Sequence, residues 1–233
     1  MKTKTEWRAF VVAAVLACLA LLVFIIAVST DYWLLIDMPL DEETVNSTEH
    51  SIILSRRVGL WEVCTTRVYT ANHKTETTCN NINLFPTEDD EENSNILLDY
   101  RRSETAMSIV ALSVMILGEV FMVYAYKQNK YMITRLTGIL FLISVVAVLA
   151  CIQLFQAAKR PVLQSVQDEI KRPVQSHYGW SFGFAWVTLT LVLVAGVVFL
   201  ALSRKRKKTH GVPGDEEDTD SNDDNGTSQV DDL

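Results

Sequence analysis

The chain has 233 residues, 49% of them hydrophobic, with 21 Lys and Arg against 28 Asp and Glu. The apolar residues are massed in four blocks of about 20, the length that crosses roughly 30 Å of hydrocarbon, which excludes an ordinary soluble domain and predicts a multispanning membrane protein. The net charge of -7 is local, because nine acids and no base lie in residues 215–233, so it says little about partners. We expect contact with membrane lipids and no nucleic-acid partner.

The first predicted span covers residues 9–28, after an amino-terminal segment that contains Lys2, Lys4 and Arg8. A cleaved signal peptide is the alternative interpretation. Its apolar region is typically only about 7 to 15 residues long and ends at a small-residue cleavage site. Because this block is longer and such a cleavage site is not convincing here, we predict a retained membrane helix.

A long polar loop over residues 29–105 follows the first span. Stretches such as Ser51–Ser55 and Leu60–Thr65 alternate between apolar and polar residues, which predicts short half-buried strands separated by turns. Residues 93–100 place Asn and Ser before an apolar run, which indicates a short helix leading into the second span. The loop is therefore expected to form a small antiparallel sheet.

The remaining apolar blocks complete the predicted bundle. Three further spans are expected at residues 106–126, 132–155 and 179–202. The short turn after the second span makes the second and third helices antiparallel neighbours. A second outer loop is expected at residues 156–178. The acidic tail, residues 206–233, is predicted to be disordered because it has almost nothing to bury.

Basic residues near the span ends predict the orientation of the chain. Residues 1–8, the turn at residues 127–135 and the cluster at residues 204–208 fall on one side of a four-span chain. Lys and Arg favour the cytoplasm, so both termini are predicted to be cytoplasmic. Four basic residues in the second outer loop, Lys159, Arg160, Lys171 and Arg172, oppose this assignment.

Two glycosylation patterns test the same orientation. Asn46-Ser47-Thr48 is an acceptor sequence in the long loop, which is modified only if that loop faces the lumen. Asn225-Gly226-Thr227 also fits the pattern, but it lies in the predicted cytoplasmic tail and is expected to stay unmodified.

The four cysteines divide between the spans and the long loop. Cys18 and Cys151 lie in apolar spans and are expected to be packed apolar side chains. Cys64 and Cys79 lie in the loop, where an oxidising compartment favours a disulfide that stabilises the loop by about 3 kcal/mol in the chain-entropy model. A metal site is the alternative, but no second cysteine or histidine pair stands at ligand spacing.

Glu119 is the single acidic residue within a predicted span. Burying it in lipid is costly, so it is expected to face another helix, a water-filled gap or a protein partner. Gly118 beside it allows close approach of a neighbouring backbone. An internal hydrogen bond to Thr134 or Thr137 of the third span is one interpretation, and contact with a partner protein is the other.

Motifs for catalysis are not evident in the sequence. The histidines are scattered, and no metalloprotease motif, glycine-rich phosphate loop or intramembrane acid–base pair occurs. We therefore predict that the chain is not an enzyme, needs no cofactor, and acts as an adaptor. The final residues, Val230–Leu233, are only a weak match to the segments that carboxylate-capturing domains bind.

Trp33, Gly59-Leu60-Trp61, Cys64 and Cys79, in a four-span chain whose first outer loop is the larger, resemble the claudin superfamily over about residues 7–205. The resemblance implies an α-helical membrane fold, with a four-helix bundle below an extracellular antiparallel sheet of about five strands. It also implies that the tryptophans and the disulfide brace the sheet on the bundle. From this we expect Trp61 to be a buried anchor.

Within the superfamily two branches are similar to the chain. Gly59–Arg67 resembles the muscle-type gamma subunits of voltage-gated calcium channels, whereas Phe85-Pro86 and Tyr178–Phe182 look like the transmembrane AMPA-receptor regulatory proteins. The first resemblance implies an auxiliary plasma-membrane subunit, in muscle sarcolemma or transverse tubule, that modulates the gating and current of a pore-forming calcium-channel subunit. An AMPA-type glutamate receptor is the alternative partner, and a claudin-like cell-junction protein is the alternative function.

Overall fold

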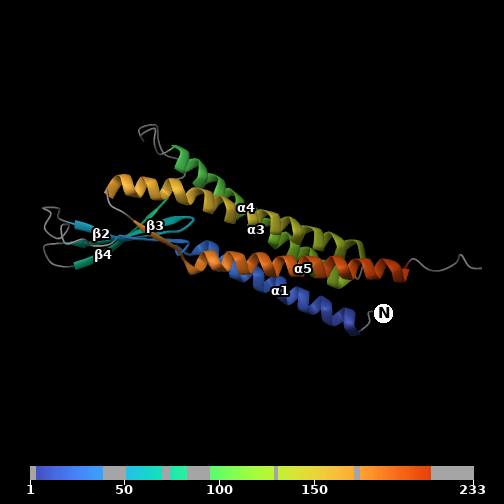
Figure 1. The fold of residues 1–233 in the computed structure, drawn as a ribbon. Helices are drawn as coiled ribbons and strands as arrows, with labels where there is room; N and C mark the ends of the chain where they lie inside the picture. The colour runs from blue at the N-terminus through green and yellow to red at the C-terminus, as the bar shows by residue number, and fades with distance from the viewer. Residues whose placement is uncertain are drawn as a thin grey trace, which may run out of the picture.

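The computed structural model describes residues 4–38, 51–69, 74–82, 95–128, 131–170 and 174–210. Four long helices run side by side, and a small sheet lies at one end of them (Figure 1). The helices are α1 (Lys4–Ser29), α3 (Asn95–Gln128), α4 (Tyr131–Ile170) and α5 (Trp180–His210). Each is long and apolar enough to cross a membrane, so the predicted four-span architecture is confirmed.

Helix α4 corrects the predicted second outer loop. It runs as one helix of 40 residues through Pro161 to Ile170, where we expected a loop over residues 156–178. At about 1.5 Å per residue it is roughly 60 Å long, twice the hydrocarbon thickness of a bilayer. Pro161 removes one backbone donor, but Val162 and Val166 after it lie one turn apart and are buried. Their burial sustains the helix beyond the proline.

Helices α3 and α5 also extend beyond the predicted spans. Helix α3 begins at Asn95, so the short helix expected before the second span is continuous with that span. Helix α5 continues to His210, whereas residues 206–210 were assigned to the disordered tail. The rest of the tail, residues 211–233, lies outside the described residues.

The sheet has five antiparallel strands in the order β4-β3-β2-β1-β5, which confirms the predicted small antiparallel sheet. The strands are β1 (Leu34–Asp37), β2 (Ser51–Val58), β3 (Glu62–Tyr69), β4 (Lys74–Asn81) and β5 (Gln175–Tyr178). The sequence did not predict β5, which comes from the second outer segment and pairs with β1, so that Tyr178 lies opposite Leu34. The two outer segments therefore form one sheet.

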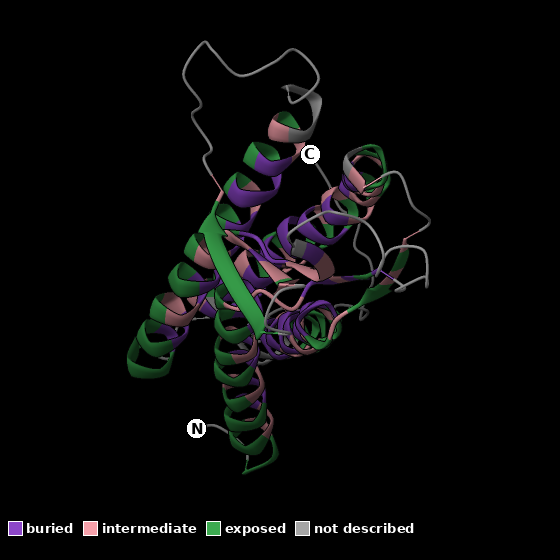
Figure 2. Ribbon diagram, turned by 90° about the vertical axis from the view of Figure 1, so that its left-hand side faces the viewer, coloured by how far each residue is buried: buried purple, intermediate pink, exposed green. Residues whose placement is uncertain are grey.

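Burial within the bundle follows the helical period. In α1 the buried residues Ala13, Ala17, Ala20 and Ala27 recur at intervals of three, four and seven. Small side chains of this kind let helix backbones approach closely in a membrane, and α1 packs chiefly on α5. Figure 2 shows the inward sides of the helices as buried and the outward sides as exposed.

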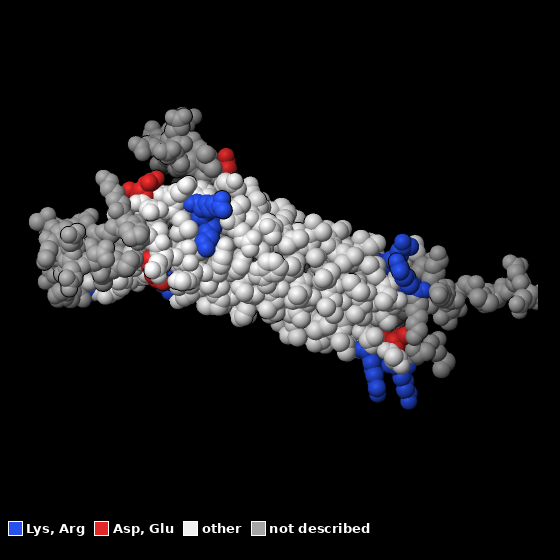
Figure 3. Space-filling model, viewed as in Figure 1, with Lys and Arg blue, Asp and Glu red and all other residues white. Residues whose placement is uncertain are grey.

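The charged residues mark the two ends of the molecule. On the face shown in Figure 3, a broad belt between these ends carries no Lys, Arg, Asp or Glu. The ends of the four helices that lie away from the sheet come together in Figure 1. They carry Lys4, Arg8, Lys127, Arg135 and Arg204. The basic segments therefore share one end of the bundle, as a four-span chain requires.

Candidate functional site

The sheet joins the bundle through Trp33, which lies between the end of α1 and the start of β1. Trp33 is fully buried, and its indole Nε1 donates a hydrogen bond of 2.6 Å to the carbonyl oxygen of Ala27. Its ring packs against Phe155 of α4 and Phe182 of α5, at centroid distances of 5.0 and 6.2 Å. One aromatic side chain therefore ties β1 to three helices.

The segment Gly59-Leu60-Trp61 forms the turn between β2 and β3. A Cβ on Gly59 would lie 2.6 Å from the Cα of Asp31, so only glycine allows the backbones to approach this closely. Leu60 is buried in the core. Trp61, in contrast, is 37% exposed, and its Nε1 donates a hydrogen bond of 2.9 Å to the carbonyl oxygen of Val28.

The expectation that Trp61 is a buried anchor was wrong. The anchor is Trp33, and Trp61 lies at the surface where the sheet meets the helix ends. Indole rings favour the boundary between membrane and water, because one edge hydrogen-bonds while the face stays apolar. Trp61 thus occupies a position where lipid or a partner protein can contact it.

A buried ion pair that sequence reasoning missed supports the same turn. Arg101 of α3 donates a hydrogen bond of 3.1 Å from Nη1 to the carbonyl oxygen of Gly59, and lies 3.4 Å from Oε2 of Glu104. Arg101 is 6% exposed and Glu104 only 1%. The pair links α3 to the sheet. Its sequence signal was an Arg and a Glu three residues apart, which ordinarily indicates only a solvated helix face.

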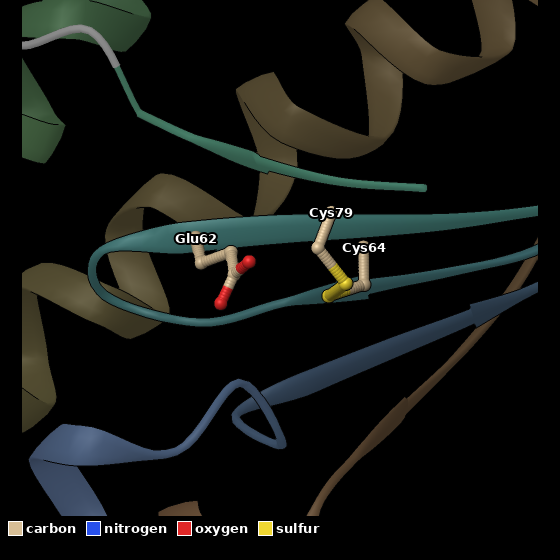
Figure 4. A group of neighbouring side chains, drawn as sticks. All are labelled: Glu62, Cys64 and Cys79. Carbon is tan, nitrogen blue, oxygen red and sulfur yellow. A yellow bond between two sulfur atoms is a disulfide. The ribbon is translucent and has the colours of Figure 1, made fainter. Parts of the chain in front are cut away.

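The disulfide between Cys64 and Cys79 joins neighbouring strands β3 and β4. The two residues lie directly opposite each other in the strand register. Glu62 lies close to both sulfur atoms (Figure 4), and these three side chains are near enough to suggest a metal site. Both thiols are consumed by the disulfide, so only one carboxylate remains as a charged ligand. The group is therefore a structural crosslink.

Glu119 of α3 contacts α1. The thiol of Cys18 lies 3.4 Å from its Oε2 and donates a hydrogen bond to it, while its Oε1 has no partner among the described residues. Thr137 of α4 donates instead to the carbonyl oxygen of Ile133, and among the described residues the hydrogen bond to Glu119 comes from α1. Cys151 is packed as expected, but Cys18 is exposed on the helix surface, which corrects that prediction.

The remaining predicted site residue, Asn46, lies outside the described residues, so its glycosylation stays a prediction. Among the residues that are described, those of the turn and the disulfide come together at the sheet, whereas Glu119 lies within the membrane-spanning part of α3. The molecule therefore offers two candidate contact regions, one at the sheet and one within the membrane.

Comparison with known proteins agrees with this architecture. The family described as "PMP-22/EMP/MP20/Claudin tight junction" matches residues 18–201. The chain is 27% identical over 188 residues to the voltage-dependent calcium channel gamma-5 subunit of Homo sapiens, which covers 78% of this chain and 65% of that protein. It is 22% identical over 217 residues to the gamma-1 subunit of Sus scrofa, covering 87% and 92%, and 28% identical over 206 residues to the gamma-7 subunit of Homo sapiens, covering 83% and 70%.

Four membrane helices with a disulfide-bridged sheet at one end define a claudin-like membrane protein. The chain belongs to the PMP-22/EMP/MP20/Claudin family. It is a multi-pass membrane protein and not an enzyme. Its similarity to gamma-1, gamma-5, gamma-6 and gamma-7 subunits confirms the resemblance to the gamma-subunit branch. The chain spans only 65% of the gamma-5 subunit's length.

Proposed function

We propose that this chain is an auxiliary subunit of a voltage-gated calcium channel, bound to the pore-forming subunit and altering its gating and current. The observation that carries the proposal is the similarity to a calcium channel gamma-1 subunit, which extends over 92% of that protein's length. The cytoplasmic side is assigned to the helix ends away from the sheet, and the plasma membrane is the proposed location. Muscle sarcolemma or transverse tubule is the specific membrane that we favour.

The geometry supports regulation by binding. Trp33 and Arg101 connect the sheet to the helices. A partner that contacts both regions therefore binds a single connected unit. An auxiliary subunit changes gating if it binds one state of the channel better than another. A difference of about 1.4 kcal/mol between two states changes their ratio tenfold. This mechanism requires no catalysed reaction.

The first experiment is co-purification of the tagged chain with the pore-forming subunit from native membrane. We expect the two to be recovered together. In parallel, current from the channel is recorded with and without the chain, and we expect altered inactivation and current size. Repeated recovery without any calcium channel, together with unchanged currents, would reject the proposal.

An AMPA-type glutamate receptor is the second candidate partner. The residues that resemble the AMPA-receptor regulatory proteins, Tyr178–Phe182, span the end of β5 and the first turn of α5. There the ring of Tyr178 stacks on that of Phe182 with a centroid distance of 4.4 Å. Recording calcium-channel and AMPA-receptor currents in matched cells, each with and without the chain, separates the two partners. A change in paracellular conductance with neither current altered would instead favour a junction protein.

A further inference from the structure

Helices α1 and α3 meet along a narrow line of contact. Helix α1 packs chiefly on α5 and only lightly on α3, whereas α3 packs extensively on α4. At the end away from the sheet, Trp7 and Tyr126 bring the two helices together with ring centroids 5.4 Å apart. Further along, Cys18 and Glu119 face each other. We call this line the α1/α3 seam.

Glu119 places an unsatisfied polar group on the α1/α3 seam. It lies seven residues before Tyr126 on α3, about 10 Å deeper into the bilayer. Its one partner among the described residues is the thiol of Cys18, a weak donor that contacts Oε2, while Oε1 is buried without a hydrogen bond from those residues. A carboxyl group at this depth is costly unless a donor satisfies it. The isolated chain provides only part of that requirement.

Packing prevents α3 from turning this carboxyl group inward. Gly118 lies against α4, and a Cβ at that position would be 2.9 Å from Cε1 of Phe141. The face of α3 next to Glu119 is therefore already filled by α4. Rotation of α3 to bury Glu119 would separate this contact, so the carboxyl group stays at the seam.

The rim of the α1/α3 seam is apolar and accessible from the bilayer. Val15 and Leu22 flank Cys18 on α1 and are 52% and 57% exposed. Ile116 and Val123 flank Glu119 on α3 and are 50% and 53% exposed. An apolar rim around one acidic group matches a transmembrane helix that is apolar except for one basic residue.

We propose that the α1/α3 seam binds a membrane helix of the channel's pore-forming subunit, and that an Arg or Lys on that helix pairs with Glu119. This inference rests on the proposed function and adds the docking face and the chemistry of the partner. Lipid tails carry no donor, and phosphate headgroups share the negative charge of the carboxylate. A second copy of the chain is a poor fit, because the basic residue of its spans, Arg135, lies near the helix end.

The test uses a photo-crosslinking amino acid in the full chain, co-expressed with the pore-forming subunit. Probes replace Val15 and Val123 on the seam, and control probes replace Val146 of α4 and Val194 of α5, which are also exposed at 67% and 48%. We expect adducts with the channel at the seam positions to exceed those at the control positions about tenfold, the ratio for a preference of 1.4 kcal/mol.

Two substitutions of Glu119 provide the chemical test. Glu119→Leu removes the polar group from the seam and is not expected to impair folding, because it replaces an incompletely satisfied acid with an apolar side chain. It should lower recovery of the channel about tenfold at equal surface abundance, while Glu119→Gln, which keeps an acceptor, loses less. Surface biotinylation measures the abundance.

The outcomes distinguish a failure of the α1/α3 seam as the docking site from a failure of the proposed function. Adducts confined to Val146 and Val194, or full recovery of the channel by Glu119→Leu, would overturn the seam and leave an auxiliary subunit that docks elsewhere. No recovery of the channel even by the unaltered chain would overturn both. Adducts at Val15 and Val123 that disappear in Glu119→Leu would support both.

Discussion

Replacing Arg101 by methionine tests whether the buried ion pair holds the sheet on the bundle. Methionine keeps much of the side-chain volume but removes the charge and all donors. The carboxylate of Glu104, 1% exposed, then loses its buried cationic partner, and the carbonyl oxygen of Gly59 loses the 3.1 Å hydrogen bond from α3. Removing one member of a buried pair typically costs about 3–5 kcal/mol, because the remaining charge is uncompensated.

The assay is thermal unfolding of the purified chain in detergent, combined with its surface abundance in cells. The neighbouring Arg102 is the matched control, because it pairs with Asp99 through side chains that are 43% and 74% exposed. Arg102→Met should cost at most about 1 kcal/mol, as exposed pairs do.

A double variant tests whether the unpaired carboxylate of Glu104 causes the loss of stability in Arg101→Met. Arg101→Met combined with Glu104→Leu leaves no unpaired charge, so it should regain most of the stability that Arg101→Met loses. If Arg101→Met unfolds at the same temperature as Arg102→Met, the ion pair does not hold the sheet. If the double variant is as unstable as the single one, the unpaired carboxylate is not the reason.

Three further predictions concern the sheet and its loop. Trp33→Ala should cost about 3–5 kcal/mol because it empties a buried site, whereas Trp61→Ala should cost only about 1–2 kcal/mol through a hydrogen bond and partial packing; unfolding curves of both variants compare them directly. Gly59→Ala should cost about 1–3 kcal/mol because of the contact with Asp31, while Gly183→Ala, with nothing within 4 Å of the added methyl group, should be neutral or stabilising in the same assay. Asn46→Gln should abolish a glycosidase-sensitive shift in gel mobility, and an unchanged shift would contradict the assigned orientation.

The amino-acid sequence alone determined the membrane class, the small sheet and the pairing of Cys64 with Cys79. These features depend on local or compositional properties: a run of about 20 apolar residues crosses a bilayer, and alternation produces a half-buried strand. Two loop cysteines in an oxidising compartment pair with few competitors. No detailed knowledge of tertiary contacts is needed for any of these inferences.

The tertiary structure decided where the polar and aromatic groups lie. Pro161 predicted a break, but burial of Val162 and Val166 sustains α4 past it. The sequence does not distinguish the environments of Trp33 and Trp61. In the structure Trp33 is enclosed by α4 and α5, whereas Trp61 lies at the surface. These outcomes depend on residues far apart in the chain, because burial and the satisfaction of a polar group are set by whichever distant element packs against it.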